Sequence, residues 1–412
     1  MIEIHKILNN KNNVIKNLNK RNIDATYAIN KVYQLEFDRR DILKKIEKIR
    51  FNFNNLNKIK EKCDEDIEKC KKLKLDIKLK EEYLDRIVKD IHNTLIKIPN
   101  VPADDVKFGD KYEDNDILYV KDYDYNLPEN PLKHWEIAEK YNIIDFELGT
   151  KITERGFPVY IDKGARLQRA VINFCLDEAN KYGFKEHQVP ILVNRDTVYA
   201  TGQYPDKEGQ MYHIEKDDLY LVPTAEVPLT NIFRDTLLEK EKLPILVTGY
   251  TPCFRREAGA YGKDTKGLNR LHQFDKIELV CITTQEDGYE RLEILKDYIE
   301  TLLDKLKLTY RVLKLCGYEL GFGAAKAYDI ETWCPVQEKW LEVVTVTNFD
   351  TFQANRLNCR YKDGGGKKLV HTLNGTGLAL PRIIATILET YQTKDGVVIP
   401  EVLQNYTGFL TI

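Results

Sequence analysis

The first 98 residues of the chain contain neither glycine nor proline, although the whole chain has 22 glycines and 14 prolines. Glycine and proline are the residues that most often end helices and form turns. Their absence over so long a stretch predicts nearly continuous helix at the start of the chain. Two prolines in IPNVPADDV (98–106) then mark the end of this region.

Several further features are missing, and each excludes a class of protein. No apolar run approaches the roughly 18 residues of a membrane span, and the first residues, MIEIHKILNNKNN, lack the apolar region of a signal peptide. The eight cysteines form no C-x-x-C pair, which argues against a zinc site and a disulfide framework. We therefore expect a cytoplasmic protein with reduced thiols and no membrane partner.

The common nucleotide-binding and hydrolytic motifs are absent as well. The chain has no G-x-x-x-x-G-K-[ST] loop, no G-x-G-x-x-G turn between a strand and a helix, no nucleophile elbow and no H-E-x-x-H. GGGKK (364–368) is glycine-rich, but it precedes the strand-like LVHTL, so we interpret it as a surface loop. A nucleotide, if one binds, is held without a P-loop or a Rossmann turn.

Apolar residues within the glycine-free region recur with the spacing of a heptad. Positions 42, 46, 49, 53 and 56 follow a 4,3,4,3 rhythm, and positions 70, 73, 77, 84, 87, 91 and 98 continue the seven-residue repeat. The polar KIKEKCDEDIEK between the two sets suits a turn. We predict an antiparallel hairpin of two helices, each of about 30 residues and about 45 Å long. A coiled coil that serves only dimerisation is the alternative.

The charge of the chain is unevenly distributed. Residues 1–97 contain 24 basic and 16 acidic residues, a net charge of +8, whereas the whole chain carries −2. The rest of the chain therefore carries −10. A basic segment on an acidic body is typical of a protein that contacts a polyanion through that segment, although a solvated lysine-rich helix has the same composition.

Beyond about residue 150, short strand-like runs alternate with helical stretches. Strands are predicted at FPVYI, LYLVP, ILVTGY, IELVCI and WLEVVTV, and a helix at ARLQRAVINFCLDEANKYG. Several strands in succession with few helices between them indicate an α+β domain built on an antiparallel sheet. We expect a helical arm over 1–100, a linker over 101–135 and a sheet domain over 136–412.

Charged residues lie in or beside several of these strand-like segments. A single charge of this kind is more often on a solvated strand face, but a charge that leaves water needs a partner. Together these residues suit a substrate with phosphates, an ammonium group and a bound metal ion. They are Glu226, Arg255, Arg256, Glu257, Glu278, Glu342 and Arg382.

PCFRREAGAYGKDTKGLNRLHQFDKIE (252–278) resembles motif 2 of the bacterial-type seryl-tRNA synthetases, a family of class II aminoacyl-tRNA synthetases. TAEVPLTN (224–231) is similar to a further loop of that family, ANKYGFKEHQVP (179–190) to its motif 1 and HTLNGTGLALPR (371–382) to its motif 3. The resemblance extends over the whole chain. It implies an N-terminal tRNA-binding coiled-coil arm and, over 136–412, a class II catalytic domain whose antiparallel sheet is flanked by helices.

The resemblance also implies a reaction. The chain would join L-serine to ATP and transfer serine from the adenylate to the 3′ end of tRNA(Ser), with tRNA(Sec) as a possible second acceptor. Attack on the α-phosphate needs no protein nucleophile, so positioning and charge stabilisation do most of the work. The arm would lie along the double-stranded variable arm of the tRNA, which is recognised mainly by shape and backbone. A homodimer built through motif 1 is implied too.

Particular residues receive roles from the same resemblance. Arg255 would bridge the serine carboxylate and the α-phosphate, because a planar guanidinium matches both anions. Glu257 would accept from the adenine amino group, and Phe274 would stack on the adenine ring opposite Arg382. Arg255, Glu257 and Arg382 are the implied catalytic residues. The implied ATP-binding residues are Arg255, Arg256, Glu257, Arg270, Phe274, Glu342, Val343, Val344, Thr345 and Arg382.

The amino-acid and metal sites are implied in the same way. Glu226 would hold the serine ammonium, and Glu278 would accept from the serine hydroxyl. Glu342 and Thr345 would hold Mg²⁺, which prefers oxygen ligands. The family usually has a serine where this chain has Val344, so we expect reduced efficiency rather than inactivity. The implied serine-binding residues are Thr224, Ala225, Glu226, Arg255, Glu278, Asn374 and Thr376.

Two alternative functions belong to other classes. A related protein can activate an amino acid for another acceptor, such as a carrier protein, but such relatives lack the long arm. A non-catalytic paralogue that binds RNA is expected to lose Arg255, Glu257 or Glu342, and this chain has all three. We interpret the long segment between the two strands of motif 2, with Gly259, Gly262 and Gly267, as a loop that orders around ATP and then around the acceptor end of tRNA.

Overall fold

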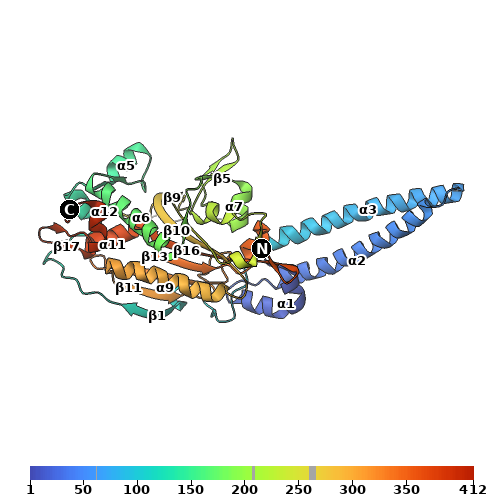
Figure 1. The fold of residues 1–412 in the computed structure, drawn as a ribbon, viewed down its shortest axis with the longest axis horizontal. Coiled ribbons are helices and arrows are strands. Elements are labelled where there is room, and N and C mark those ends of the chain that lie inside the picture. Colours follow the sequence, from blue (N-terminus) through green and yellow to red (C-terminus); the bar gives the residue numbers. More distant parts are fainter. Residues whose placement is uncertain (62, 207–208, 259–265) are drawn as a thin grey trace.

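The computed structural model describes residues 1–61, 63–206, 209–258 and 266–412. Figure 1 shows a long helical arm that projects from a larger body with a sheet at its centre. No helix in the described ranges is long and apolar enough to cross a membrane. The helices are α1 (Ile4–Asn19), α2 (Thr26–Asn57), α3 (Asp64–Leu95), α4 (His134–Lys140), α5 (Phe146–Ile152), α6 (Lys163–Tyr182), α7 (Arg195–Thr201), α8 (Glu226–Asn231), α9 (Gly288–Leu306), α10 (Phe352–Leu357), α11 (Leu380–Thr390) and α12 (Glu401–Thr407).

The arm is the antiparallel pair of α2 and α3, which confirms the predicted hairpin (Figure 1). Each helix has 32 residues, a length of about 48 Å at 1.5 Å per residue. Between Ile46 and Ile87 none of the described side chains is buried. The arm is therefore held at its root, where the buried apolar side chains are Ile29, Val32, Ile46, Ile87, Ile91 and Leu95.

The glycine- and proline-free region contains a break that its composition did not predict. The chain turns between α1 and α2, and Asn22 takes a φ of 57° there. Asparagine enters this left-handed region at lower cost than most side chains. The turn allows α1 to pack against the root of the arm in one apolar cluster with α2 and α3.

Arg21, beside this turn, connects the arm to the body. Its guanidinium is buried and donates to the carbonyls of Asn100 at 2.9 Å and Leu320 at 2.7 Å. Burial lowers the pKa of Arg21 to about 9. Because its partners include backbone carbonyls from both regions, the guanidinium holds the arm root and the body together.

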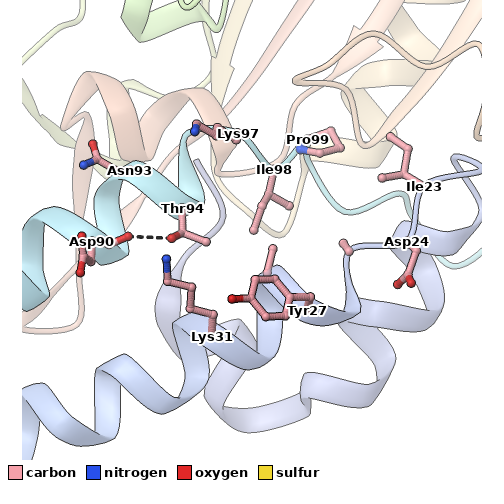
Figure 2. A pocket seen from close by; sticks show the side chains of 12 residues that line it. Ile23, Asp24, Tyr27, Lys31, Asp90, Asn93, Thr94, Lys97, Ile98 and Pro99 are labelled. Carbon is pink, nitrogen blue, oxygen red and sulfur yellow. Dashed lines mark hydrogen bonds between the residues drawn. The ribbon is translucent and has the colours of Figure 1, made fainter.

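A hollow of about 320 Å³ opens at the arm root, between the start of α2 and the end of α3 (Figure 2). Tyr27 and Lys31 from α2 face Asp90 and Thr94 from α3 across it. The Thr94 hydroxyl donates to the Asp90 carbonyl at 2.7 Å. None of these four side chains is buried, so the hollow provides no low-dielectric environment for chemistry.

An eight-stranded sheet forms the centre of the body, in the order β1-β11-β12-β13-β16-β10-β9-β4. Neighbouring strands are antiparallel except β4, which runs parallel to β9. This is the predicted antiparallel α+β architecture. The strands of this sheet are β1 (Asp116–Lys121), β4 (Lys185–Glu186), β9 (Ile245–Phe254), β10 (Gln273–Thr283), β11 (Tyr310–Lys314), β12 (Lys326–Cys334), β13 (Lys339–Asn348) and β16 (His371–Ala379).

Smaller sheets and turns complete the body. The GGGKK segment forms the turn of a hairpin, where Gly364 and Gly365 take φ values of 53° and 91°, so it is not a phosphate loop. Two 3-10 turns are η1 (Tyr112–Asp114) and η2 (Lys240–Lys242). The remaining strands are β2 (Ile144–Asp145), β3 (Val159–Tyr160), β5 (Leu192–Asn194), β6 (His213–Ile214), β7 (Leu219–Leu221), β8 (Leu237–Glu239), β14 (Arg360–Asp363), β15 (Gly366–Leu369), β17 (Gln392–Thr393) and β18 (Gly396–Val397).

Residues 101–135, predicted as a linker, contribute β1 to an edge of the main sheet. β1 pairs with β11 and has a register shift between Ile117 and Tyr119. Its run DILYVK is β-branched and aromatic, which is typical of a strand. Part of this segment therefore belongs to the sheet. The helix-then-strand pattern of 179–190 corresponds to the end of α6 followed by β4 at the opposite edge.

The two faces of the sheet have different surroundings. Helices α6, α9 and α11 pack against one face in the main apolar core. Successive side chains of a strand point to opposite faces, so Ile277 and Leu279 of β10 enter this core while Lys276 and Glu278 point to the other face. Short helices α8 and α10 cover one end of that second face. The polar side chains of the central strands gather there.

Candidate active site

A hollow of about 220 Å³ lies over β10, β13 and β16, at the end of β9 and the start of α11. Four segments with the charged residues noted in the sequence therefore meet at this hollow: the end of β9, β10, β13 and the start of α11. Eight of the ten residues implied for ATP line this hollow. Its lining residues are Arg255, Glu257, Leu268, Asn269, Arg270, Leu271, Phe274, Lys276, Glu342, Val343, Val344, Thr376, Ala379, Pro381 and Arg382.

Three arginines converge on the hollow. The Arg255 guanidinium lies 5.2 Å from the centroid of the Phe274 ring, and its Nε donates to a backbone carbonyl at 3.3 Å. Arg382 donates to the carbonyls of Asn269 at 3.1 Å and Glu342 at 2.5 Å. Rings and carbonyls hold a guanidinium without cancelling its charge, so the charge of Arg255 remains available to an anionic ligand. Arg382 Nη1 lies 3.9 Å from a Glu342 carboxylate oxygen as well.

The third arginine pairs with the carboxylate implied for adenine. Arg270 Nη1 lies 3.0 Å from an oxygen of Glu257. Glu257 has a φ of 48°, which is uncommon for a residue other than glycine. Such backbone strain is concentrated at functional sites. Here it redirects the chain directly after β9 and brings the carboxylate back toward the hollow.

Arg256 and Thr345, the other two residues implied for ATP, do not line the hollow. The backbone amide of Arg256 donates to the Gln210 carbonyl at 2.8 Å, and its guanidinium lies over the Tyr212 ring, 5.8 Å from the centroid. Neighbouring residues of an extended segment point to opposite sides. Arg255 and Arg256 are therefore directed differently, and Arg255 alone enters the hollow.

A buried polar pocket adjoins the hollow, centred on the fully buried carboxylate of Glu278. Asn374 Nδ2 donates to one of its oxygens at 2.9 Å. The Thr224 hydroxyl donates to the other at 3.0 Å, and Lys276 Nζ lies 2.7 Å from that same oxygen. Burial raises the pKa of Glu278 even though Lys276 acts in the opposite direction. Thr376 of β16 lies beside Glu278 in register and lines the hollow.

Glu226, the first residue of α8, is a second buried carboxylate of this pocket. Gln353 of α10 donates to it at 2.6 Å, and the Gln353 carbonyl oxygen accepts from the Thr372 hydroxyl at 2.7 Å. Burial and, next, the nearby charge of Glu278 raise the pKa of Glu226 to about 7. When both carboxylates are ionised, the pocket has two negative charges and one lysine, so it can accept one further cation.

The remaining predicted serine-binding residue, Ala225, contributes no polar side-chain atom. It is fully buried in an apolar cluster with Leu229 and Val280. Its place before α8 sets the position of Glu226. Ala225 therefore contributes to the pocket through the backbone.

Two polar residues of the pocket were not predicted. Lys276 is two positions before Glu278 on β10, and the two-residue period of a strand places both on one face. That alternation was a usable signal. Gln353 lies 127 residues after Glu226 in the chain, so no local pattern connects the two.

A bulge in β13 brings the predicted metal-binding pair to one side. Residues three apart on a regular strand point to opposite faces. Between β12 and β13, Ile330 pairs with Val344 and Glu331 with Glu342, so Val343 is an extra residue. As a result the Thr345 hydroxyl reaches a Glu342 carboxylate oxygen at 3.3 Å.

Asp329 of β12 adds a further oxygen beside this pair. It is buried opposite Thr345 in register, and its Oδ1 has no hydrogen-bond partner among the described residues. Burial and then the charge of Glu342 raise the pKa of Asp329 well above its ordinary value. The carboxylates of Glu342 and Asp329 and the hydroxyl of Thr345 together form a set of oxygen donors that suits a hard cation such as Mg²⁺.

The central part of the loop between β9 and β10, with Gly259 and Gly262, lies outside the described residues. Gly267, on the returning side, takes a φ of 70°. Glycine adopts this conformation at little cost. The predicted role of this loop in ordering around substrates remains a hypothesis.

The sheet order, the hollow with its three arginines and the adjoining acidic pocket define a class II aminoacyl-tRNA synthetase. Residues 211–391 match the family model described as tRNA synthetase class II core domain (G, H, P, S and T). Residues 1–102 match the seryl-tRNA synthetase N-terminal domain. The chain belongs to the seryl-tRNA synthetase family.

Similar proteins cover the chain from end to end. The serine–tRNA ligase of Salinibacter ruber is 41% identical over 424 residues, which cover 100% of this chain and 99% of that protein. The serine–tRNA ligase of Methylacidiphilum infernorum is 43% identical over 418 residues, which cover 98% of this chain and 99% of that protein. The crystal structure of seryl-tRNA synthetase from Pyrococcus horikoshii complexed with ATP covers 100% of both chains, with a TM-score of 0.94 and 33% identity.

Proposed function

We propose that this chain is a serine–tRNA ligase, which forms seryl-adenylate from L-serine and ATP and then charges tRNA(Ser). The observation that carries the proposal is the direct contact between two sites of opposite charge. The buried pocket contains the carboxylates of Glu226 and Glu278 and one lysine, whereas the adjoining hollow presents three guanidinium groups. The ammonium of serine complements the pocket, and the phosphates of ATP complement the hollow.

Adenylate formation requires positioning rather than proton transfer. An oxygen of the serine carboxylate attacks the α-phosphorus of ATP, the bond to the bridging oxygen breaks, and pyrophosphate leaves. The carboxylate is already ionised, so no base is needed. Arg255 stands where the pocket meets the hollow, and a guanidinium binds carboxylate and phosphate oxygens in the same planar geometry. Arg255 would hold the two reactants together.

The adenine and polyphosphate ends of ATP have their own partners in the hollow. Phe274, now covered by the Arg255 guanidinium, would stack on the adenine ring. Glu257 would accept from the adenine amino group, which requires it to exchange its contact with Arg270. Arg270 and Arg382 would then bind the phosphates. In the second step the terminal ribose hydroxyl of tRNA attacks the serine carbonyl carbon, and AMP leaves.

The pocket also explains a preference for serine. Glu278 has three donors in the free protein, and a carboxylate has room for about four. The serine hydroxyl would supply the fourth, whereas alanine has none to offer. A site built to bind a hydroxyl can discriminate against a substrate that lacks it by a factor of up to roughly 10⁴–10⁵ in kcat/KM. The methyl group of threonine is excluded only by space, so we expect threonine to be the leading error.

Glu342 and Thr345 would hold Mg²⁺, with Asp329 behind them. When bound, the ion would neutralise part of the phosphate charge. Mg²⁺ usually keeps several waters, so two protein ligands are sufficient. The Val344 side chain, which replaces a hydroxyl of the family, is buried in the apolar core. Because Val344 also lines the hollow, we expect loss of the family's hydroxyl at this position to reduce efficiency rather than abolish activity.

The tRNA and a second subunit complete the proposed machinery. The basic arm would lie along the variable arm of tRNA(Ser), as the net charge of +8 on residues 1–97 supports. A homodimer built through motif 1, at the β4 edge of the sheet, is part of the proposal. At the opposite edge, β1 presents four consecutive exposed apolar side chains from Ile117 to Val120. Uncovered edges of this kind invite pairing with another chain. The proposal places the reaction in the cytoplasm.

Two assays on the purified chain test this proposal. ATP–pyrophosphate exchange with serine, alanine and threonine measures adenylate formation, and charging of tRNA(Ser) transcript measures transfer. We expect serine-dependent activity in both, and exchange with threonine ahead of alanine. Exchange without charging would favour another acceptor. Absence of both, with tRNA binding retained, would favour a non-catalytic RNA-binding protein.

A further inference from the structure

His134, Cys334 and Glu389 form a fully buried cluster behind the active site. His134 begins α4, Cys334 ends β12, and Glu389 lies near the end of α11. One ligand atom from each lies within 4.8 Å of the others. Such a set of side chains is typical of a metal site, but every one of these residues already has hydrogen-bond partners.

Both ring nitrogens of His134 are occupied. Nε2 accepts the backbone N–H of Leu268 at 2.9 Å. An acceptor at Nε2 places the proton of a neutral imidazole on Nδ1, which lies 2.9 Å from a Glu389 oxygen and donates to it. The Cys334 thiol accepts from Gln337 at 3.0 Å. We therefore interpret the cluster as a hydrogen-bond network.

Glu389 is the fixed point of this network. One oxygen accepts from the backbone and ring of His134 and from the Gln337 side chain, at 3.0, 2.9 and 3.0 Å. The other accepts the backbone amides of Val336 and Gln337 at 3.1 Å each. Burial acts to raise the pKa of Glu389, but the hydrogen bonds from His134 hold it below its ordinary value. Both oxygens of this buried carboxylate are thus hydrogen-bonded.

From His134 the contacts continue into the hollow. The chain at Gly267 passes directly over the imidazole, so a Cβ there would overlap Nε2 of His134. Two residues further on, Asn269 donates from its side chain to Gln337 at 2.8 Å. The Asn269 carbonyl accepts from Arg382 at 3.1 Å. The next residue, Arg270, pairs with Glu257.

We propose that His134 is a positioning residue for ATP: by accepting the Leu268 amide, it fixes residues 266–271 and thereby the directions of Arg270 and Arg382. It touches no substrate itself. The inference rests on the proposed binding of ATP in the hollow. It assigns the buried cluster to loop positioning. It also separates ATP affinity from serine affinity, because within the described part of the chain the residues of the serine pocket make no hydrogen bond or ion pair with the cluster.

Two substitutions of similar size separate the two hydrogen bonds of the ring. In His134→Gln, the side-chain oxygen can replace Nε2 and accept the Leu268 amide. In His134→Asn, the shorter amide can replace Nδ1 and donate to Glu389, but it ends short of Leu268. In pyrophosphate exchange we expect H134N to raise KM for ATP roughly tenfold, the effect of one lost hydrogen bond. We expect H134Q to stay within about threefold, and KM for serine to remain unchanged in both.

Gly267→Ala provides an independent test from the loop side. Its Cβ would displace the loop from His134, so it should reproduce the ATP-specific effect of H134N. Thermal unfolding of each variant reports whether it is folded. If H134N does not fold, the comparison of KM for ATP between G267A and H134Q still tests the inference. Equal rises in KM for ATP and serine, or equal effects of H134N and H134Q, would overturn the inference.

A bound metal is a further outcome that would overturn it. Elemental analysis of the purified protein should find no stoichiometric zinc. After EDTA treatment, when Mg²⁺ is restored and no zinc is added, KM for ATP should be unchanged. Failure of this inference leaves serine-dependent exchange by the unaltered chain intact. Failure of the proposed function would instead remove that exchange altogether.

Discussion

The arm and the sheet domain both pair basic with acidic residues, but in different surroundings. On the arm, Arg50 of α2 meets Glu81 of α3 with side chains that are 59% and 42% exposed. In the sheet domain, Lys276 and Glu278 are 10% and 0% exposed and lie 2.7 Å apart. Water and salt screen the first pair. The low dielectric of the interior makes the second pair costly to break.

This difference separates two uses of charge in one chain. The exposed lysines and arginines of the arm add to a field that attracts a polyanion, and no single one of them needs a fixed position. The buried charges of the site act over a few ångströms and need several hydrogen bonds each. The arm should therefore tolerate single substitutions that the site does not.

The largest effect is expected for Lys276→Met. The substitution leaves Glu278 buried without its cation, which typically costs about 3–5 kcal/mol of folding stability. Urea unfolding of the variant and the unaltered chain measures the difference. A loss below about 1 kcal/mol would show that Thr224 and Asn374 satisfy the carboxylate by themselves.

Arg255→Lys sharpens the comparison within the site. Lysine keeps the charge but loses the planar fork that binds two anions. We expect kcat/KM for serine-dependent exchange to fall by roughly 10²–10³. Affinity for tRNA, measured by filter binding, should remain unchanged because the arm is intact. Near-normal exchange would show that charge alone is sufficient at this position.

Removal of the outer arm tests the other side of the comparison. Arg50 and Glu81 face each other across the hairpin, so residues 51–80 can be replaced by a short glycine linker without touching the buried root. We expect charging of tRNA to fall roughly 100-fold through lost phosphate contacts, with exchange within twofold of normal. Full charging by this variant would contradict the proposed role of the arm.

The raised pKa of Glu226, about 7, predicts a pH dependence of serine binding. Below this value the carboxyl is increasingly protonated and loses its attraction for the serine ammonium. KM for serine should therefore rise about tenfold between pH 8 and pH 6, if one proton is taken up. Glu226→Gln should have a high KM at both pH values and no such slope. A flat profile in the unaltered chain would contradict the assignment.

The smallest effect is expected for Glu81→Gln on the arm. Exposed ion pairs contribute little, so the change in unfolding free energy should stay within about 0.5 kcal/mol. Measured in the same urea series as Lys276→Met, it provides the matched exposed control. Comparable losses in the two variants would remove the distinction between the arm and the site.

Much of this architecture could be predicted from local pattern. The heptad spacing predicted the hairpin, and strand-like runs predicted β9, β10 and β13. The resemblance at 252–278 pointed to Arg255, Glu257 and Phe274, which the structure gathers around one hollow. Alternation along β10 also contained the signal for Lys276. Signals of this kind survive in a sequence because neighbouring residues share one element and its period.

Other features depended on contacts between distant parts of the chain. Asn22 breaks the first helix without glycine or proline, because packing of α1 on the arm root favours the turn. The bulge at Val343 exists only in the register between β12 and β13. His134 and Glu389 are 255 positions apart, and neither lies in a pattern that predicts the other.

The sequence by itself determined which elements form and which chemical groups the site contains, since helix and strand periods and the motif residues are local properties. Tertiary structure decided which of those groups meet. It directed Arg255 into the hollow and Arg256 away from it, and it brought Gln353 to Glu226. The physical reason is that burial fixes charged side chains only where partners from remote segments replace their lost water.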